Sequence, residues 1–422
     1  ISDKVITFEN VNYNKNDRKV DKILTSKKYG FPIMLCLLMV VFWITIIGAN
    51  YPSSILYDFL FWIEDKLLDL FRMIKAPIWL SNCLVLGVYR VLAWVISVML
   101  PPMAIFFPLF TLLEDLGYLP RIAFNLDRCF KKCKTCGKQA LTMCMGFGCN
   151  AAGVTGARII DSPRERLIAI LTNSFVPCNG RFPAIISIIT MFFVGFNVSL
   201  GNSLLTTVIL TLIILMGIFM TFTISRLLSN TILKGMPSSF TLELPPYRKP
   251  QIGKVLIRSI FDRTLFVLGR AISVAAPAGL VIWVLANVNY NGLSLLEYCS
   301  NFLDPIGSLM GLDGVILMAF ILGFPANEIV IPLIIMGYMA MGTITEFDNL
   351  VELKKLLISN GWTTTTAINF IVFSLFHFPC STTCMTIRKE TGSNKWMFVA
   401  IIIPTLVGFI FCVLINLFFK II

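Results

Sequence analysis

The sequence predicts an all-α, polytopic membrane protein built from an inverted repeat with two interrupted gate helices. Hydrophobic residues make up 57% of the 422 positions and charged residues only 14%, which is too apolar for a soluble protein of this length. Part of the chain also repeats, because Gly146 and Asn150 recur as Gly323 and Asn327, each 177 residues later. Duplication with Gly, Pro, Asn and Cys inside apolar segments is typical of transporters with broken helices.

Seven apolar stretches are near or above the length of about 20 residues that a helix needs to cross a bilayer. They cover residues 31–50, 82–112, 167–196, 203–228, 265–288, 363–386 and 395–419. Two more stretches, 139–158 and 312–340, are interrupted by Gly-Phe motifs, and we expect each to form a re-entrant hairpin. The segment 54–75 mixes acidic and apolar residues at helical spacing, which predicts a separate amphipathic helix at the outer surface.

These segments divide the chain into five expected regions. They are a cytoplasmic lead at 1–29, a first transmembrane helix with the amphipathic helix at 30–80, gate repeat 1 at 81–228, a cytoplasmic linker at 229–264, and gate repeat 2 with a C-terminal transmembrane helix at 265–422. The chain opens at Ile1 without an initiator Met, so we expect it to be a piece of a longer polypeptide.

The net charge of +12 does not indicate a nucleic-acid partner, because the basic residues lie in connections between apolar segments. Cytoplasmic connections carry an excess of Lys and Arg, so we expect the basic connection 158–166 inside and the net acidic connection 341–361 outside. The segments 82–112 and 265–288 then cross in opposite directions. The two hairpins therefore enter from opposite sides, and we expect their tips to meet near the middle of the membrane.

Residues that interrupt helices stand at matching places in the two copies. The expected gate helix breakers are Gly146, Gly148, Pro177, Gly323, Pro325 and Pro379. Backbone groups freed at such breaks must be satisfied by protein, water or substrate. An Asn follows each Gly-Phe motif, at Asn150 and Asn327, and two interpretations stay open: each Asn caps a half-helix, or each turns its carbonyl toward a cation.

Three cysteines and one glutamate are the main candidates for chemistry. Cys149 lies in the first Gly-Phe motif, and Cys178 and Cys380 each follow a proline inside a span. A buried Cys is by default a small apolar residue, but sulfur combined with carbonyl and carboxylate oxygen suits a borderline ion such as ferrous iron. Glu328 is an ionisable group at membrane depth, so it either serves the transport path or pairs with the buried Arg181.

The other polar features receive simpler interpretations. The single histidine, His377, is expected to be a packing residue, and Cys129, Cys133 and Cys136 are expected to lie in a reduced, lysine-rich loop. No phosphate-binding loop, nucleophile elbow or paired zinc-binding histidines occur in the sequence. The chain is therefore not expected to be an enzyme or to hold a covalently bound cofactor.

Several strings together resemble the membrane domain of FeoB-type ferrous iron transporters. They occupy residues 145–150, 161–167, 175–178, 244–248 and 387–393, and the resemblance covers nearly all of the chain from about residue 20. It implies a gate fold related to that of nucleoside carriers, with two gates in opposite orientation, Fe²⁺ as substrate, and Cys149, Cys178 and Cys380 as gate cysteines.

The resemblance also implies partners and a location. Members of the family usually carry a GTPase domain that binds GTP and Mg²⁺, which is absent from this chain and would act in cis or in trans. Small FeoA- or FeoC-type accessory proteins, a homo-oligomer, the lipid bilayer and the bacterial inner membrane are further expectations. Two other functions stay open: a nucleoside or organic-solute carrier of related fold, and a membrane thiol oxidoreductase using Cys178 and Cys380.

Overall fold

The computed structural model describes most of the chain as helix. The described residues are 15–26, 28–195, 200–235, 247, 251–253, 257, 259–290, 292–340, 342–344 and 350–421. Within them, the strands are limited to the antiparallel pair β1 (Asn289–Tyr290) and β2 (Leu293–Ser294). The prediction of an all-α membrane protein is therefore confirmed.

Seven helical segments of the described residues are long and apolar enough to cross a bilayer. They are Gly30–Met73, Ile78–Asp115, Pro163–Val194, Leu205–Asn230, Leu268–Asn287, Thr364–Thr391 and Asn394–Ile421. Each one overlaps one of the seven stretches predicted from hydropathy. An eighth candidate is the pair Leu295–Leu309 and Gly314–Leu322, which is bent by 111°, as expected of a broken, re-entrant segment.

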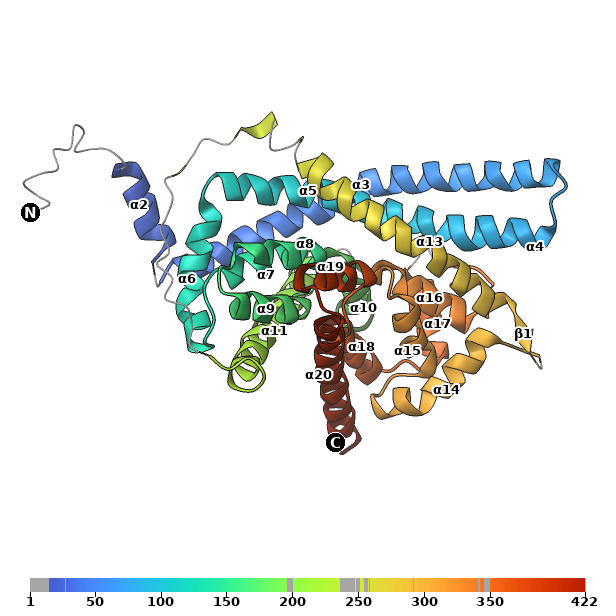
Figure 1. Cartoon of the computed structure of the whole chain (residues 1–422). Helices are drawn as coiled ribbons and strands as arrows, with labels where there is room; N and C mark the ends of the chain where they lie inside the picture. The colour runs from blue at the N-terminus through green and yellow to red at the C-terminus, as the bar shows by residue number, and fades with distance from the viewer. Residues whose placement is uncertain are drawn as a thin grey trace, which may run out of the picture.

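The first transmembrane segment and the expected amphipathic helix form one continuous helix. Helix α3 (Gly30–Met73) runs through Pro52 without a break, and beside it lie α4 (Ile78–Ser81), the π-helix η1 (Asn82–Tyr89) and α5 (Arg90–Asp115) (Figure 1). Glu64 of α3 pairs with Arg90 of α5, whose Nε lies 3.0 Å from Glu64 Oε1. This ion pair gives the buried Glu64 a partner within the protein, whereas the sequence alone assigned it to a membrane surface.

The lead and the linker meet at one aspartate. In α2 (Lys15–Leu24), the Asp21 carboxylate accepts from Arg121 Nε at 3.0 Å and from the Tyr247 hydroxyl at 2.7 Å. The Arg121 guanidinium also lies over the Tyr247 ring, 4.2 Å from its centroid. Most of the expected linker, and the lead before residue 15, lie outside the described residues, so their boundaries stay predictions.

The first repeat continues in a series of short helices and ends in a long one. Its elements are α6 (Tyr118–Lys132), α7 (Gln139–Gly148), α8 (Asn150–Gly156), η2 (Ala157–Ile159), α9 (Pro163–Thr172), η3 (Asn173–Phe175), η4 (Asn179–Arg181), α10 (Phe182–Ile189), η5 (Thr190–Val194) and α11 (Leu200–Asn230). Helix α9 begins where the sequence indicates, since the Ser162 side chain accepts from Glu165 N and Pro163 is the first helical residue.

The second repeat has the same plan. Its elements are η6 (Ser259–Thr264), α13 (Leu265–Asn287), α14 (Leu295–Leu309), α15 (Gly314–Leu322), η7 (Asn327–Ile329), α16 (Val330–Tyr338), α17 (Leu350–Ser359), α18 (Thr364–Phe376), α19 (Ser381–Thr391) and α20 (Asn394–Ile421). Helix α14 begins at a capping box formed by Ser294 and Glu297. The long final helix α20 corresponds to α11 of the first repeat.

A hydrogen bond recurs at the same place in both repeats. Asp127 Oδ1 accepts from Gly137 N at 2.9 Å, and Asp304 Oδ1 accepts from Gly314 N at 3.0 Å. Both members of this pair are displaced by 177 residues, which is the offset found in the sequence. The carboxylate closes the turn before a gate hairpin in each copy, so the sequence repeat is also a structural repeat.

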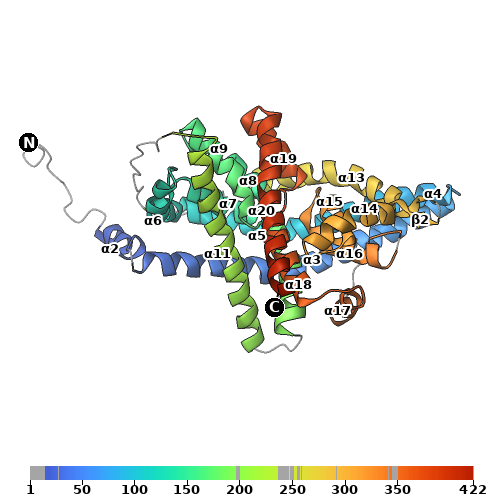
Figure 2. The same ribbon diagram turned by 90° about the horizontal axis from the view of Figure 1, so that it is seen from below.

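The two repeats pack around a shared centre. In Figure 1, α20 runs between the helices of the first repeat and α14, α15 and α18 of the second, and Figure 2 shows α11 and α20 crossing the middle of the molecule. The buried core there combines residues of α9, η3, α10, α16 and α18, including Phe175 of η3 and Phe376 of α18, whose ring centroids are 5.8 Å apart. The broken helices of both repeats therefore meet inside one core.

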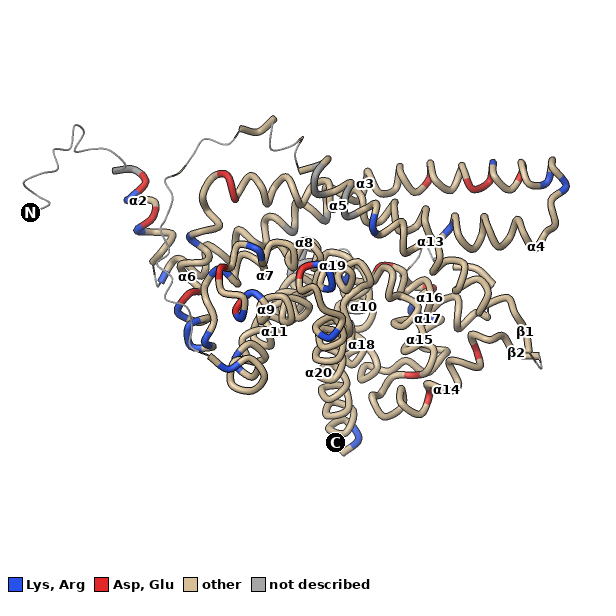
Figure 3. The backbone as a smooth tube through the Cα atoms, in the orientation of Figure 1, with Lys and Arg blue, Asp and Glu red and all other residues tan. Residues whose placement is uncertain are grey.

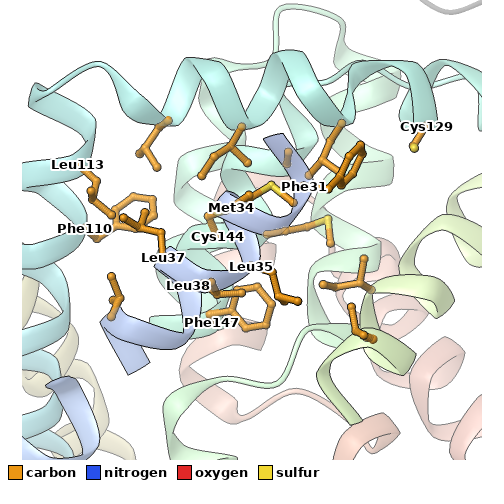
Figure 4. Close-up of a pocket in the computed structure, with 18 of the residues that line it drawn as sticks. Phe31, Met34, Leu35, Leu37, Leu38, Phe110, Leu113, Cys129, Cys144 and Phe147 are labelled. Atoms are coloured by element: carbon orange, nitrogen blue, oxygen red, sulfur yellow. The ribbon is translucent and has the colours of Figure 1, made fainter. Parts of the chain in front are cut away.

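A separate cavity of about 210 Å³ lies beside the first hairpin (Figure 4). Its walls come from α3, α5, α6, α7 and α11, and apart from the thiols of Cys129 and Cys144 they consist of apolar side chains such as Leu38, Phe110 and Phe147. A divalent cation needs oxygen, nitrogen or thiolate ligands to replace its water. The lining of this cavity is therefore unsuitable for an ion path.

Candidate functional site

The Gly-Phe motifs form equivalent breaks in the two repeats. Helix α7 ends at Gly148, and the next residue, Cys149, is extended with φ −155° and ψ 125° before α8 begins. In the second repeat, Ala326 is extended with φ −153° and ψ 122° before η7. These two residues are 177 positions apart and share one backbone conformation. The predicted pair of matching breaks is thus present in the backbone itself.

Glycines in the first break permit close packing, whereas the chain turns one residue later. Gly146 and Gly148 lie in the last turn of α7. A Cβ at Gly146 would come 2.8 Å from Asn173 Oδ1, and one at Gly148 would overlap the ring of Phe106. The two glycines therefore do not break the helix as expected, because the extended residue is Cys149. They instead allow Asn173 and Phe106 to pack closely against α7.

The second hairpin breaks at its own Gly and Pro. Gly323 ends α15, and Pro325 lies between it and the extended Ala326. The freed carbonyls are satisfied by the start of α19, since Ser381 N donates to Phe324 O at 2.8 Å and the Ser381 hydroxyl donates to Pro325 O at 3.4 Å. The hairpin of the second repeat is thus attached to the break that contains Cys380.

Cys178 and Cys380 occupy equivalent positions, each directly before a helix. Cys178 precedes η4 with φ −83° and ψ 166°, and Cys380 precedes α19 with φ −61° and ψ 160°. Pro177 and Pro379 stand immediately before them in the breaks. The sequence prediction that the two thiols lie at matching helix starts agrees with this backbone.

Both predicted asparagines stand at the start of a helix without capping it through their side chains. The N-cap positions belong to Cys149 and Ala326, and neither makes a side-chain cap. The Asn150 amide nitrogen instead donates to the Gly146 and Val176 carbonyls. The interpretation of the asparagines as helix caps is therefore wrong, because their amides contact other segments.

The Asn327 amide lies between a thiol and an imidazole. Its nitrogen is placed 4.0 Å from Cys178 Sγ, and its oxygen 3.2 Å from His377 Nε2. His377 is buried and its ring also packs against the Phe320 ring, with centroids 5.0 Å apart. The expected packing role of His377 holds, but sequence reasoning missed its polar contact because 50 residues separate it from Asn327.

The Glu328 carboxylate lies against the backbone beside Cys178. A Cβ added at Gly180 would overlap Glu328 Oε1 and come 2.6 Å from its Cδ. Cys178 and Cys380 both lie within electrostatic reach of this carboxylate. The predicted carboxylate and two of the predicted thiols therefore gather where η4, η7 and α19 meet.

Arg181 does not pair with Glu328, which corrects the structural alternative for that residue. Its guanidinium donates to the carbonyls of Ser174 at 3.2 Å, Leu375 at 2.7 Å and His377 at 3.3 Å, and also to Phe378 at 3.4 Å. These carbonyls belong to the ends of η3 and α18, which have no further helical turn to bind them. Arg181 thus joins the two broken spans, and no ion pair to Glu328 occurs among the described residues.

The three candidate thiols lie near one another but do not by themselves form a metal-binding site. Cys149 lies within electrostatic reach of Cys380 and Cys178, and the Cys380 thiol lies 3.2 Å from the Thr383 hydroxyl. In the described part of the chain, however, no three His, Cys, Asp or Glu side chains are placed to hold a metal ion together. An ion here would need amide, hydroxyl or backbone oxygens as additional ligands.

The loop expected at Cys129, Cys133 and Cys136 is only partly present, because Cys129 lies in α6 and only Cys133 and Cys136 follow the end of that helix. All twelve are free thiols, and Cys129, Cys133 and Cys136 do not gather a metal-binding set among the described residues. Outside the core, Arg158 Nε and Nη2 each lie 2.7 Å from a Glu390 carboxylate oxygen, joining η2 to α19 across the repeats. Nothing in the sequence pattern of either residue indicates this pair.

Comparison with known families gives a consistent assignment. A family model described as "Gate: Nucleoside recognition" matches residues 96–192 and 268–394, which contain the two pairs of breaks and cover more than half of the chain. A second model, "Ferrous iron transport protein B C terminus", matches residues 210–262, from α11 into the segment that joins the repeats.

Curated relatives cover nearly the whole chain. A Staphylococcus aureus (strain MSSA476) protein named "Fe(2+) transporter FeoB" is 30% identical over 419 residues, which are 96% of this chain and 60% of the relative. The Methanocaldococcus jannaschii protein of that name is 28% identical over 94% of this chain and 58% of its own length. A Porphyromonas gingivalis "Fe(2+) transport protein A/Fe(2+) transporter FeoB fusion protein" is 24% identical over 91% and 49%.

The chain therefore spans about 60% of the length of the first of these relatives. A search of solved structures finds no match. The Gate model matches most of both repeats, the C-terminal model matches residues 210–262 between them, and the relatives named here align over 91% to 96% of this chain. On these grounds, the chain belongs to the family of ferrous iron transport protein B and contains its two Gate regions.

Proposed function

We propose that this chain is the permease part of a ferrous iron transporter, which moves Fe²⁺ into the cytoplasm between two inverted gates. The observation that carries the proposal is the meeting of Cys178, Cys380, Asn327 and Glu328 where the broken helices of both repeats touch. Sulfur and oxygen in one place suit ferrous iron, which is a borderline ion. The names of the relatives support this cargo.

The same residues make the two other functions less suitable. A nucleoside carrier needs amide and aromatic contacts for a base and ribose, and has no use for several thiols and a carboxylate at the break. A thiol oxidoreductase needs two sulfurs that form a disulfide, usually with a haem or quinone site. In this structure Cys178 and Cys380 are free thiols.

Two features support an orientation with the basic connections in the cytoplasm. Many of the Lys and Arg residues lie around α6, α9 and α19 (Figure 3). The ion pair between Arg158 and Glu390 brings the basic connections 158–166 and 388–395 together. A common basic side is what the positive-inside rule requires, so the chain is proposed as a multi-pass protein of the bacterial inner membrane.

Partners of the whole protein follow from the length and names of the relatives. The relatives extend well beyond the aligned part, and we propose that a GTPase domain, with GTP and Mg²⁺, drives the gates in cis or in trans. The fused Fe(2+) transport protein A of the Porphyromonas gingivalis relative supports an accessory partner of that type. The chain itself is proposed to act as a transport domain and not as an enzyme.

Replacing the candidate thiols one at a time tests the proposed function. Cys149→Ser, Cys178→Ser and Cys380→Ser are each expected to lower Fe²⁺ uptake into proteoliposomes at least about tenfold, because oxygen replaces a soft ligand only in part. Cys36→Ser and Cys412→Ser are the matched controls and are expected to change uptake less than about twofold. Equal, small effects at all five positions would remove the thiols from the path.

Gly180→Ala tests the place of the carboxylate without touching it. The added methyl would overlap Glu328 Oε1, so the flexible side chain must move away from Cys178. We expect Fe²⁺ uptake to fall about tenfold or more, since small misplacements of a functional group have large effects on rate.

The melting temperature of Gly180→Ala is expected to stay close to that of the unsubstituted protein, because a mobile side chain yields more easily than backbone. Gly269→Ala in α13 is the control, as a Cβ there meets nothing within 4 Å. Normal uptake by Gly180→Ala would mean that the position of Glu328 over Gly180 has no role in transport.

A further inference from the structure

Asn327 is held between two side chains that both contact its amide. His377 Nε2 lies 3.2 Å from one amide atom, and Cys178 Sγ lies 4.0 Å from the other. All three residues are buried. The orientation of the amide therefore decides whether an oxygen or an NH₂ group lies on the side of the thiol.

The hydrogen bonds of His377 fix this orientation. Its Nδ1 lies 2.9 Å from Ser374 O and 3.2 Å from Phe373 O, and because carbonyls only accept, Nδ1 carries the proton. A second proton on Nε2 would place a buried cation beside Arg181, whose guanidinium donates to His377 O. The ring is therefore neutral, and Nε2 accepts.

A neutral ring requires the Asn327 NH₂ group to face it. The oxygen and nitrogen of an amide have almost the same shape, so their positions follow from the hydrogen-bond partners. With Nδ2 donating to His377 Nε2, the amide is turned over and Oδ1 lies on the side of Cys178. Oxygen and sulfur then lie together beside the carboxylate of Glu328.

The first repeat reaches the same arrangement with different groups. There the Asn150 amide nitrogen donates to Gly146 O at 3.1 Å and to Val176 O at 3.2 Å. Two backbone carbonyls hold the NH₂ group, as the imidazole does in the second repeat. In both repeats the amide nitrogen is bound, which leaves the oxygen directed away from its holder.

We propose that His377 is a positioning residue, which holds the Asn327 amide with its oxygen toward Cys178 so that this oxygen contacts the passing Fe²⁺. The proposal rests on the proposed function, because it assigns a ligand atom for that cargo. An amide oxygen binds cations, whereas an NH₂ group in its place repels them. His377 does not touch the ion in this arrangement and acts only through Asn327.

A double-mutant cycle tests this role in purified protein reconstituted in proteoliposomes. His377→Phe keeps the ring volume but removes the acceptor, and we expect the KM for Fe²⁺ to rise about 10-fold to 100-fold, the loss typical when the partner of a metal ligand is removed. In an Asn327→Ala background the same substitution is expected to change KM less than about twofold. His377→Gln, whose side-chain oxygen can replace Nε2, is expected to restore most of the affinity.

The outcomes separate the positioning role from a structural one. An equal loss from His377→Phe in both backgrounds, or no change of KM in the unsubstituted background, would overturn the proposal. If His377→Phe does not fold, His377→Gln and His377→Leu in the two backgrounds replace it in the same comparison.

A second readout keeps this inference apart from the proposed function. Co²⁺ is added to the detergent-solubilised protein, and the absorption of a Co²⁺–thiolate contact at Cys178 is titrated. If the unsubstituted protein takes up no Fe²⁺, the proposed function fails. The positioning role is still supported if His377→Phe binds Co²⁺ more weakly than the unsubstituted protein, while the same substitution leaves Co²⁺ binding unchanged in the Asn327→Ala background. Unchanged Co²⁺ binding in His377→Phe would overturn it.

Discussion

Replacing Glu328 with glutamine is expected to lower Fe²⁺ uptake about 100-fold or more while the protein still folds. A divalent cation in a low-dielectric site needs an anion nearby, and leaving a buried charge without its partner costs about 3–5 kcal/mol, where each 1.4 kcal/mol is a factor of ten. The glutamine keeps the shape of the side chain and removes only the charge. The neutral amide is also easier to bury than the carboxylate, so membrane insertion should survive.

The structure makes this substitution informative because Glu328 has no ion pair among the described residues. The carboxylate lies over Gly180 and within electrostatic reach of Cys178 and Cys380. Arg181, the cation that would have explained it as a structural partner, binds backbone carbonyls instead. Among the described residues, no protein cation therefore competes with an ion for the Glu328 carboxylate.

Uptake of radioactive Fe²⁺ and thermal unfolding, measured on the same reconstituted protein, decide the result. Glu352→Gln in α17 is the matched control, because that carboxylate is exposed and distant in sequence from the breaks. Uptake by the control should stay within about twofold of the unsubstituted protein. If Glu328→Gln transports normally, or fails only because it unfolds, another group must balance the ion.

Hydropathy and the repeat made most of the fold predictable. Seven stretches of sufficient length became seven candidate spans, and the 177-residue offset reappeared as equal dihedral angles at Cys149 and Ala326. Both signals can be read directly from the sequence. Hydropathy depends on residues that are near one another in the chain, and the repeat depends on the same motif occurring twice. Local signals failed at α3, which continues as one helix past Pro52 and places Glu64 beside Arg90 of a neighbouring helix.

The site was predicted in its residue types but not in its connections. A thiol beside a proline in an apolar span can be read from sequence, and so can a carboxylate at membrane depth. The contacts of Arg181 with Leu375 and of Asn327 with His377 join residues 194 and 50 positions apart. Nothing periodic links such pairs, so only the packed structure reveals that the two broken spans share one set of polar contacts.

Arg181→Met is expected to lower the free energy of unfolding by about 3 kcal/mol or more. The substitution removes the donors to the buried carbonyls of Ser174, Leu375, His377 and Phe378. Each buried group left without a partner costs about 1–3 kcal/mol, and the long methionine side chain fills the space without replacing a donor. Because those carbonyls end the two broken helices, the loss falls on the contact that joins the repeats.

Thermal unfolding in detergent, followed by tryptophan fluorescence, measures this loss, and Arg128→Met on the exposed face of α6 is the control. Arg181→Lys keeps the charge, but a single ammonium group cannot reach carbonyls spread over two helix ends. We therefore expect it to be destabilised nearly as much as Arg181→Met. A lysine variant as stable as the unsubstituted protein would show that charge near the thiols matters more than the carbonyl contacts. Loss of stability in Arg181→Met together with its retention in Glu328→Gln would separate the residue that holds the gates together from the residue that serves the ion.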